Sequence, residues 1–123
     1  MVGVIEFDPA HVVGTGGAIG ALLRQYVSAL VDVKGYPTGT FTVNVLGSFA
    51  LGFVTFLGAD TTLLLLFGTG LCGSFTTFSS FSFETVRLWE TGEPGQAIGN
   101  AGGNLLGAGI AIGLAWALVE LLA

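Results

Sequence analysis

The feature that most constrains this chain is an apolar run that becomes rich in glycine and hydroxyl residues over 68–84. The run starts at Leu63 like a membrane helix, but Gly68, Gly70 and Gly73 are followed by a series of Ser and Thr side chains. A helix that faces only lipid has no use for these hydroxyls. Glycines permit a backbone break, and non-helical backbone persists at membrane depth only where its polar groups meet protein, water or an ion. The stretch therefore predicts a broken membrane span that lines a binding site.

Aromatic side chains alternate with hydroxyl residues in the same stretch. Phe75, Phe78 and Phe81 recur at the i, i+3 spacing of one helical face. A phenyl ring presents a positive edge, so rings and hydroxyls together can attract an anion. A stripe of Phe is also typical of packing against protein or lipid. The residues alone leave both roles open.

Charged residues are scarce, at 9% of the chain against 52% hydrophobic residues. The mean hydropathy is +0.85, and a soluble domain of this size needs more polar groups on its surface. The composition therefore predicts an integral membrane protein surrounded by membrane lipid. The net charge of −5 disfavours nucleic-acid binding, and the single Cys72 excludes an intramolecular disulfide.

Apolar segments separated by short polar connections predict one all-α domain, residues 1–123, with four transmembrane helices. The expected spans cover residues 12–31, 40–57, 63–86 and 98–122. The tails and the middle connection then share one side of the membrane, and the loops holding Lys34 and Arg87 share the other. Because this bias in basic residues is slight, the chain is expected to insert in either orientation and to pair with its own inverted copy.

Asn side chains fall inside the predicted spans at Asn44, Asn100 and Asn104. An amide in lipid is costly unless it is paired, and hydrogen bonding between helices is the ordinary solution. For a single Asn this role and a place on a pathway both stay open. Three of them, with the hydroxyls of the third span, favour a polar pathway. Arg24 in the first span is either a cation of a vestibule or an anchor that extends to the interface.

Four segments of the chain together match the pattern of a known family. They are Gly16–Ala21 followed by Arg24, Gly39–Phe41 with Asn44 and Gly47, Gly70–Ser82 with Glu84, and Asn104–Gly107. By these residues the chain resembles the small fluoride channels of the CrcB/Fluc family, over most of its length. The motif Gly70–Ser82 is highly specific for this family, whereas the glycine patterns alone are weak evidence for it.

The resemblance implies an antiparallel, dual-topology dimer with two fluoride pores and a structural sodium ion at its centre. Backbone carbonyls of Gly73 and Thr76 from both subunits would hold the sodium. By position, the resemblance implies that the family's paired phenylalanines are Phe78 and Phe81 and that its pore asparagine is Asn44. The family's vestibule arginine corresponds to Arg24. Its hydroxyl track corresponds to Thr77, Ser79 and Ser80, together with Asn100 and Asn104.

The chain also departs from the family pattern. Ser74 stands where the family usually has a second Gly, and Asn104 and Ala108 lie where relatives carry hydroxyls. Asn amides and hydroxyls can still replace the water of a small anion, and hard oxygen ligands suit a sodium ion. These chemistries do not decide between fluoride and chloride.

The implied function is passive export of toxic fluoride, by a homodimer or by a heterodimer with a paralogue. The alternative is a small dual-topology multidrug or cation exporter. A proton-coupled carrier of that kind is expected to hold an ionisable acid within a span, and Glu84 and Glu120 are predicted at span ends. A purely structural subunit leaves the polar residues of the third span unexplained. The sequence shows no nucleophile–base pair and no cluster of metal ligands, so it does not predict an enzyme.

Overall fold

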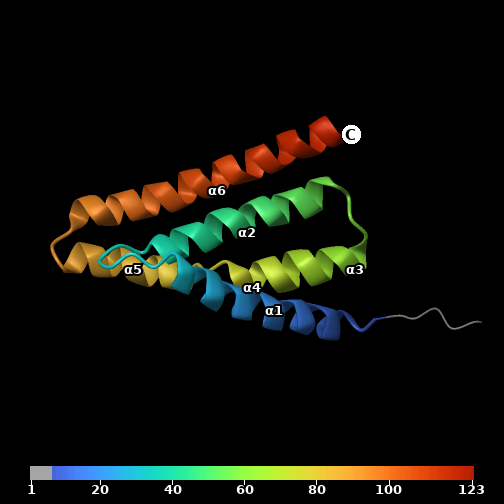
Figure 1. The fold of residues 1–123 in the computed structure, drawn as a ribbon, viewed down its shortest axis with the longest axis horizontal. Helices are drawn as coiled ribbons and strands as arrows, with labels where there is room; N and C mark the ends of the chain where they lie inside the picture. Colours follow the sequence, from blue (N-terminus) through green and yellow to red (C-terminus); the bar gives the residue numbers. More distant parts are fainter. Residues whose placement is uncertain (1–6) are drawn as a thin grey trace, which may run out of the picture.

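The computed structural model describes residues 7–123, and its regular elements are helices (Figure 1). In chain order they are α1 (Pro9–Leu30), α2 (Thr38–Phe56), α3 (Thr61–Leu63), the π-helix η1 (Leu64–Cys72), α4 (Gly73–Phe75), α5 (Ser79–Glu90) and α6 (Pro94–Leu122). Over the described residues no strand forms, and the connection after α1 contains a single antiparallel bridge between Val33 and Tyr36. The prediction of an all-α chain is confirmed.

Segments long and apolar enough to cross a membrane are Thr38–Phe56, Thr61–Glu90 and Pro94–Leu122. They correspond to the second, third and fourth predicted spans, with ends that differ by up to a few residues. Helix α1 has 22 residues, but it is not among these segments because Arg24 and Gln25 lower its hydropathy. The chain is therefore a multi-pass membrane protein, and the crossing by α1 remains a prediction.

The helices run alternately up and down (Figure 1). The α2–α3 connection and the end of α6 lie at one end of the molecule, together with the start of α1. The connections 31–37 and 91–93 lie at the other end. Helix α2 packs mainly on α6, and α1 packs mainly on η1. We call residues 61–90 the third segment. Its middle part, α4, lies between α1 and α2.

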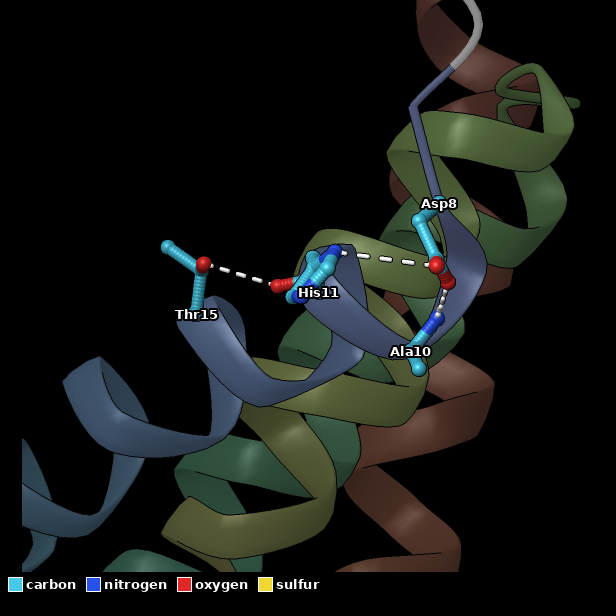
Figure 2. A network of polar contacts seen from close by, with 4 residues as sticks. All are labelled: Asp8, Ala10, His11 and Thr15. Atoms are coloured by element: carbon cyan, nitrogen blue, oxygen red, sulfur yellow. Dashed lines mark hydrogen bonds and ion pairs between the residues drawn. The ribbon is translucent and has the colours of Figure 1, made fainter.

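The start of α1 is fixed by a local cap (Figure 2). Asp8 Oδ1 accepts a hydrogen bond of 2.9 Å from the Ala10 N–H, and Pro9 occupies the first turn. His11 Nδ1 lies 3.7 Å from Asp8 Oδ2, with both side chains largely exposed. Thr15 Oγ1 donates to the His11 carbonyl at 2.7 Å. These polar groups bond to one another and serve the helix start.

The glycines that were expected to open a backbone break are helical instead. Gly68 and Gly70 lie in η1, and Gly73 begins α4. A Cβ on Gly70 would lie 2.8 Å from the Val13 carbonyl oxygen of α1. Gly16 of α1 is more crowded still, because a Cβ there would overlap the Leu66 carbonyl. Gly16 and Gly70 therefore let α1 and η1 approach closely, and the residues outside the helix come later, at 76–78.

Candidate functional site

Residues 76–78 separate α4 from α5 near the middle of the third segment. Thr76 has extended backbone, with φ −82° and ψ 162°, whereas Phe78 returns to the helical region. Thr76 N–H still donates to the Cys72 carbonyl at 3.0 Å, and Ser82 N–H donates to the Phe78 carbonyl at 2.9 Å. The backbone groups of Thr77 between them need partners from elsewhere, because unpaired polar groups inside a membrane protein are costly.

Asn44 of α2 supplies both partners. Its Oδ1 accepts from the Thr77 N–H at 2.8 Å, and its Nδ2 donates to the Thr77 carbonyl at 3.1 Å. Gly47 lies one turn further along α2, where a Cβ would overlap the Thr76 side chain. Its small size lets the interruption lie directly against α2.

Further hydrogen bonds continue from Asn44 into α6. Asn44 Nδ2 also donates to Asn104 Oδ1 at 3.0 Å. Asn104 Nδ2 donates to the carbonyl and to Oδ1 of Asn100, at 2.9 and 3.1 Å. Asn100 Nδ2 then donates to Thr85 Oγ1 at 2.8 Å, and Thr85 Oγ1 donates to the Phe81 carbonyl at 2.7 Å. We call Asn44, Asn104, Asn100 and Thr85 the amide chain.

The amide chain brings together the three Asn residues that the sequence singled out. Asn100 and Asn104 are only 1% and 5% exposed. Both side-chain N–H groups of Asn44 and of Asn104 have protein acceptors. The hydrogen bonding between helices that was left open for these residues is therefore present, and an ion could take one of these N–H groups only in exchange for a protein acceptor.

The predicted hydroxyl and phenyl groups gather at the start of α5. Thr77 Oγ1 accepts from the Ser80 N–H at 3.1 Å and lies 3.5 Å from Ser79 Oγ. The rings of Phe78 and Phe81 are 5.8 Å apart between centroids and tilted by 50°. Phe78 is 80% exposed in the single chain.

The predicted Phe stripe does not keep one environment. Phe75 is buried and belongs to the core, whereas Phe78 is exposed and Phe81 half-buried. Packing inside the chain therefore accounts for Phe75 and leaves Phe78 without cover.

Arg24 shares a surface cavity of about 450 Å³ with the hydroxyl groups of the third segment. Residues on its wall include Arg24, Thr40, Thr77, Ser80 and Glu84. A neighbouring cavity of about 690 Å³ is lined by Lys34, Arg87 and again Glu84, among others. Cations from α1, the 31–37 connection and α5 thus line the walls of these two cavities, and the cavity beside Arg24 reaches Thr77 and Ser80 near the start of α5.

Glu84 borders both cavities. Its Oε1 accepts a hydrogen bond of 2.9 Å from the Thr40 hydroxyl. Its Oε2 is buried and has no hydrogen-bond partner among the described residues. The acid lies inside α5 and within the apolar segment Thr61–Glu90, so its predicted place at a span end is only partly right.

Of the residues predicted to hold sodium, Gly73 precedes the interruption and Thr76 is its first residue. Gly73 is exposed in the single chain, and the extended backbone of Thr76 turns its carbonyl away from the helical direction. In a continuous α-helix the Gly73 carbonyl would accept from the Thr77 N–H, which Asn44 Oδ1 accepts here. Peptide carbonyls are the hard oxygen ligands that a cation such as sodium prefers. The carbonyls of Gly73 and Thr76 are therefore ligands that suit a sodium ion, and one chain supplies half of the predicted set.

Ser74, the departure from the family pattern, has a clear place. Its Oγ donates to the Gly17 carbonyl of α1 at 2.7 Å and to the Leu71 carbonyl at 3.3 Å. Ser74 therefore adds a contact between α1 and α4, and the helix continues through it to Phe75.

Sequence reasoning missed Thr85 and Thr40. Both hydroxyls pair with residues far along the chain, Asn100 and Glu84 respectively. The available signal was weak, because each is an ordinary Thr in an apolar segment. The one signal was helical spacing: Thr85 lies four residues after Phe81 and Thr40 lies four residues before Asn44, so each shares a helix face with that residue.

Comparison with known proteins gives a consistent result. Residues 11–117 match the family described as CrcB-like protein, Camphor Resistance (CrcB). The chain is 53% identical to the fluoride-specific ion channel FluC 2 of Haloarcula marismortui, covering 96% of this chain and 99% of that protein. It is 55% identical to the fluoride-specific ion channel FluC 1 of Halobacterium salinarum, covering 97% and 99%. It is 44% identical to the fluoride-specific ion channel FluC of Methanococcus aeolicus, covering 82% and 86%.

Proposed function

The chain belongs to the CrcB-like family, and from this membership we propose that it is a fluoride-specific ion channel that exports fluoride passively and protects against fluoride toxicity. The observation that carries the proposal is the near full-length identity to two fluoride-specific channels. The protein is a membrane channel and not an enzyme. Fluoride moves down its electrochemical gradient, with no chemical step for the side chains to perform.

The pathway runs from the cavity beside Arg24 to the start of α5. Arg24 attracts the anion into the cavity whose wall includes Thr77 and Ser80. Hydroxyl groups then replace part of its water shell, and the positive edges of Phe78 and Phe81 follow. The remaining members of the pathway are Ser79, Asn44, Asn100 and Asn104. Because the N–H groups of Asn44 and Asn104 already have acceptors, these two residues act on the ion only by exchanging a partner.

The working unit is an antiparallel, dual-topology dimer, formed with a second copy or with a paralogue, and its third span is broken at residues 76–78. Two features support this arrangement: the exposure of Phe78 in the single chain and the loss of the helical donor to the Gly73 carbonyl. The carbonyls of Gly73 and Thr76 from both subunits would hold a sodium ion at the dimer centre. Its positive charge would offset the charge of the anions.

A liposome assay tests the function. Purified protein is reconstituted into vesicles loaded with potassium fluoride or potassium chloride, and efflux is started with a potassium ionophore and followed with ion-selective electrodes. We expect rapid fluoride efflux and slow chloride efflux, with protein-free vesicles as the control. Equal rates for the two anions would contradict the selectivity, and absence of fluoride efflux would contradict the function.

The alternative, a proton-coupled cation or drug exporter, gains support from one observation. Glu84 is an acid inside an apolar segment with a buried, unpaired oxygen among the described residues. In such an exporter Glu84→Gln would abolish transport driven by a pH gradient. In a passive channel Glu84→Gln keeps a fluoride efflux that needs no pH gradient, and Glu90→Gln, at an exposed acid of the same helix, serves as the control.

A further inference from the structure

Thr85 is the one member of the amide chain that has no place in the proposed pathway. Its hydroxyl lies between Asn100 Nδ2 and the Phe81 carbonyl, at 2.8 and 2.7 Å. The hydrogen bonds therefore begin at the backbone of Thr77 and end at the backbone of Phe81, both in the third segment. Phe78 lies between these two ends.

The direction of every hydrogen bond in the amide chain is set from its two ends. The orientation of an Asn amide follows from its partners, because its oxygen only accepts and its nitrogen only donates. At one end the Thr77 N–H must donate, so Asn44 turns Oδ1 toward it and Nδ2 toward Asn104. Asn104 must then present Oδ1 to Asn44.

At the other end the Phe81 carbonyl can only accept. Thr85 therefore donates its hydroxyl proton to Phe81 and accepts from Asn100. This leaves Asn100 Oδ1 for the Nδ2 of Asn104. The two ends require the same direction, and bonds that run in one direction polarise one another.

Burial makes the Thr85 hydroxyl hard to replace. Asn100 is 1% exposed and Asn104 is 5% exposed, so water has little access to either amide in the single chain. Without the hydroxyl, one Asn100 N–H is left buried and without its acceptor, and no group at this end fixes the Asn100 amide. Movement of that amide weakens the bond from Asn104 Nδ2 to Asn100 Oδ1. Asn104 then depends mainly on its bond to the Asn100 carbonyl and holds Asn44 less firmly.

We propose that Thr85 is a positioning residue whose hydroxyl orients the three amides and thereby holds Thr77, and with it Phe78, in place. It contacts no ion. The consequence for fluoride flux rests on the proposed function, whereas the consequence for the Thr77 backbone does not. The two consequences are therefore measured separately.

The first measurement is hydrogen exchange at the Thr77 N–H in the purified protein. The variants are Thr85→Val, which keeps the shape and removes the hydroxyl, and Thr85→Ser, which restores a hydroxyl. Thr55→Val is the matched control, because Thr55 Oγ1 makes the same kind of bond, to the Leu51 carbonyl at 2.7 Å, on an exposed face. We expect the Thr77 N–H to exchange about tenfold faster in Thr85→Val than in the wild-type protein. This factor corresponds to a loss of about 1.4 kcal/mol of hydrogen-bond free energy. Thr85→Ser and Thr55→Val keep the wild-type rate.

Wild-type exchange in Thr85→Val would overturn the inference, and so would an equal acceleration in Thr55→Val. If Thr85→Val does not fold, Thr85→Cys and Thr55→Cys replace the pair, since a thiol is a weak hydrogen-bonding group of similar size. The same two outcomes then decide the result.

The second measurement is fluoride flux per folded protein in vesicles. We expect a reduction of about tenfold in Thr85→Val, recovery in Thr85→Ser and no change in Thr55→Val. Wild-type flux in Thr85→Val would overturn the claim that this positioning serves conduction. Absence of flux in the wild-type protein would instead refute the proposed function, and the exchange measurement would still decide the role of Thr85.

Discussion

Asn44 on α2 and Thr77 in the interruption of the third segment face each other as two paired amides, with hydrogen bonds of 2.8 and 3.1 Å. The pairing takes the Thr77 N–H away from the Gly73 carbonyl, its acceptor if the helix continued. One side chain on a neighbouring helix thus stabilises the point where the third segment leaves the helix. The same side chain then anchors the amide chain.

Asn44→Ala is expected to loosen the interruption and to reduce fluoride flux severely. The substitution leaves the Thr77 N–H and Asn104 Oδ1 without their partner, at a cost of about 1–3 kcal/mol for each buried group left unpaired. Flux per folded protein is measured in vesicles, with gel filtration to report assembly. Thr42→Ala is the control on the same helix, since among the described residues Thr42 Oγ1 bonds only to the Thr38 carbonyl. Normal flux per assembled protein in Asn44→Ala would remove Asn44 from the conduction mechanism.

The sequence was sufficient to predict that Asn44, Asn100 and Asn104 need hydrogen-bond partners, because an unpaired amide in an apolar helix is costly. It could not show that these residues pair mainly with one another and with Thr77. That result depends on the register between α2, α5 and α6, which no short pattern encodes. Thr85 was missed for the same reason.

The glycines of the third segment illustrate a different limit. The sequence predicts a backbone break around Gly70, yet Gly70 stays helical and lies against Val13 of α1. Glycine serves both purposes, because the missing Cβ permits unusual dihedral angles and also close helix packing. Choosing between them requires the position of the neighbouring helix. The interruption falls instead at residues 76–78, where Asn44 provides the replacement hydrogen bonds.

Gly20→Ala is expected to destabilise the protein, whereas Gly17→Ala is not. A Cβ at Gly20 would overlap the Leu71 carbonyl and the Ser74 hydroxyl, while a Cβ at Gly17 meets no atom of the described residues within 4 Å. Forcing α1 away from η1 costs about 1–3 kcal/mol, as for other overpacked sites, whereas Ala at an open helical site is favoured by up to about 1 kcal/mol. Thermal unfolding in detergent, followed by circular dichroism, compares the two variants. Equal midpoints would show that α1 and η1 can separate without cost.

Mixed orientation in the membrane is expected, because Lys34 and Arg87 give only a slight charge bias. The test uses Glu93→Cys on a Cys72→Ser background, since Glu93 is exposed and its side chain makes no capping hydrogen bond. An impermeant thiol reagent should label about half of the protein from outside intact cells, and the rest only after the membrane is opened. Labelling from a single side would instead favour a partner chain of opposite orientation.

Phe78→Ile and Phe81→Ile are expected to lower fluoride flux with little loss of folding. The two rings lie 5.8 Å apart beside the Thr77 hydroxyl region, and an aliphatic side chain of similar bulk has no positive edge to offer an anion. A loss of roughly 1 kcal/mol of this attraction corresponds to roughly fivefold slower flux. The measurement is flux per folded protein in vesicles, after gel filtration.

Two other Phe residues of the same segment serve as controls for these variants. Phe83 is exposed on α5 outside the proposed pathway, so Phe83→Ile should keep wild-type flux. Phe75 is buried, so Phe75→Ile should lower the unfolding temperature while the protein that remains folded conducts normally. Because Phe78 is 80% exposed in the single chain, packing within that chain cannot explain a flux defect in Phe78→Ile. Wild-type flux in both Phe78→Ile and Phe81→Ile would assign the two rings to packing between subunits or against lipid, and the anion would then depend on the hydroxyl groups alone.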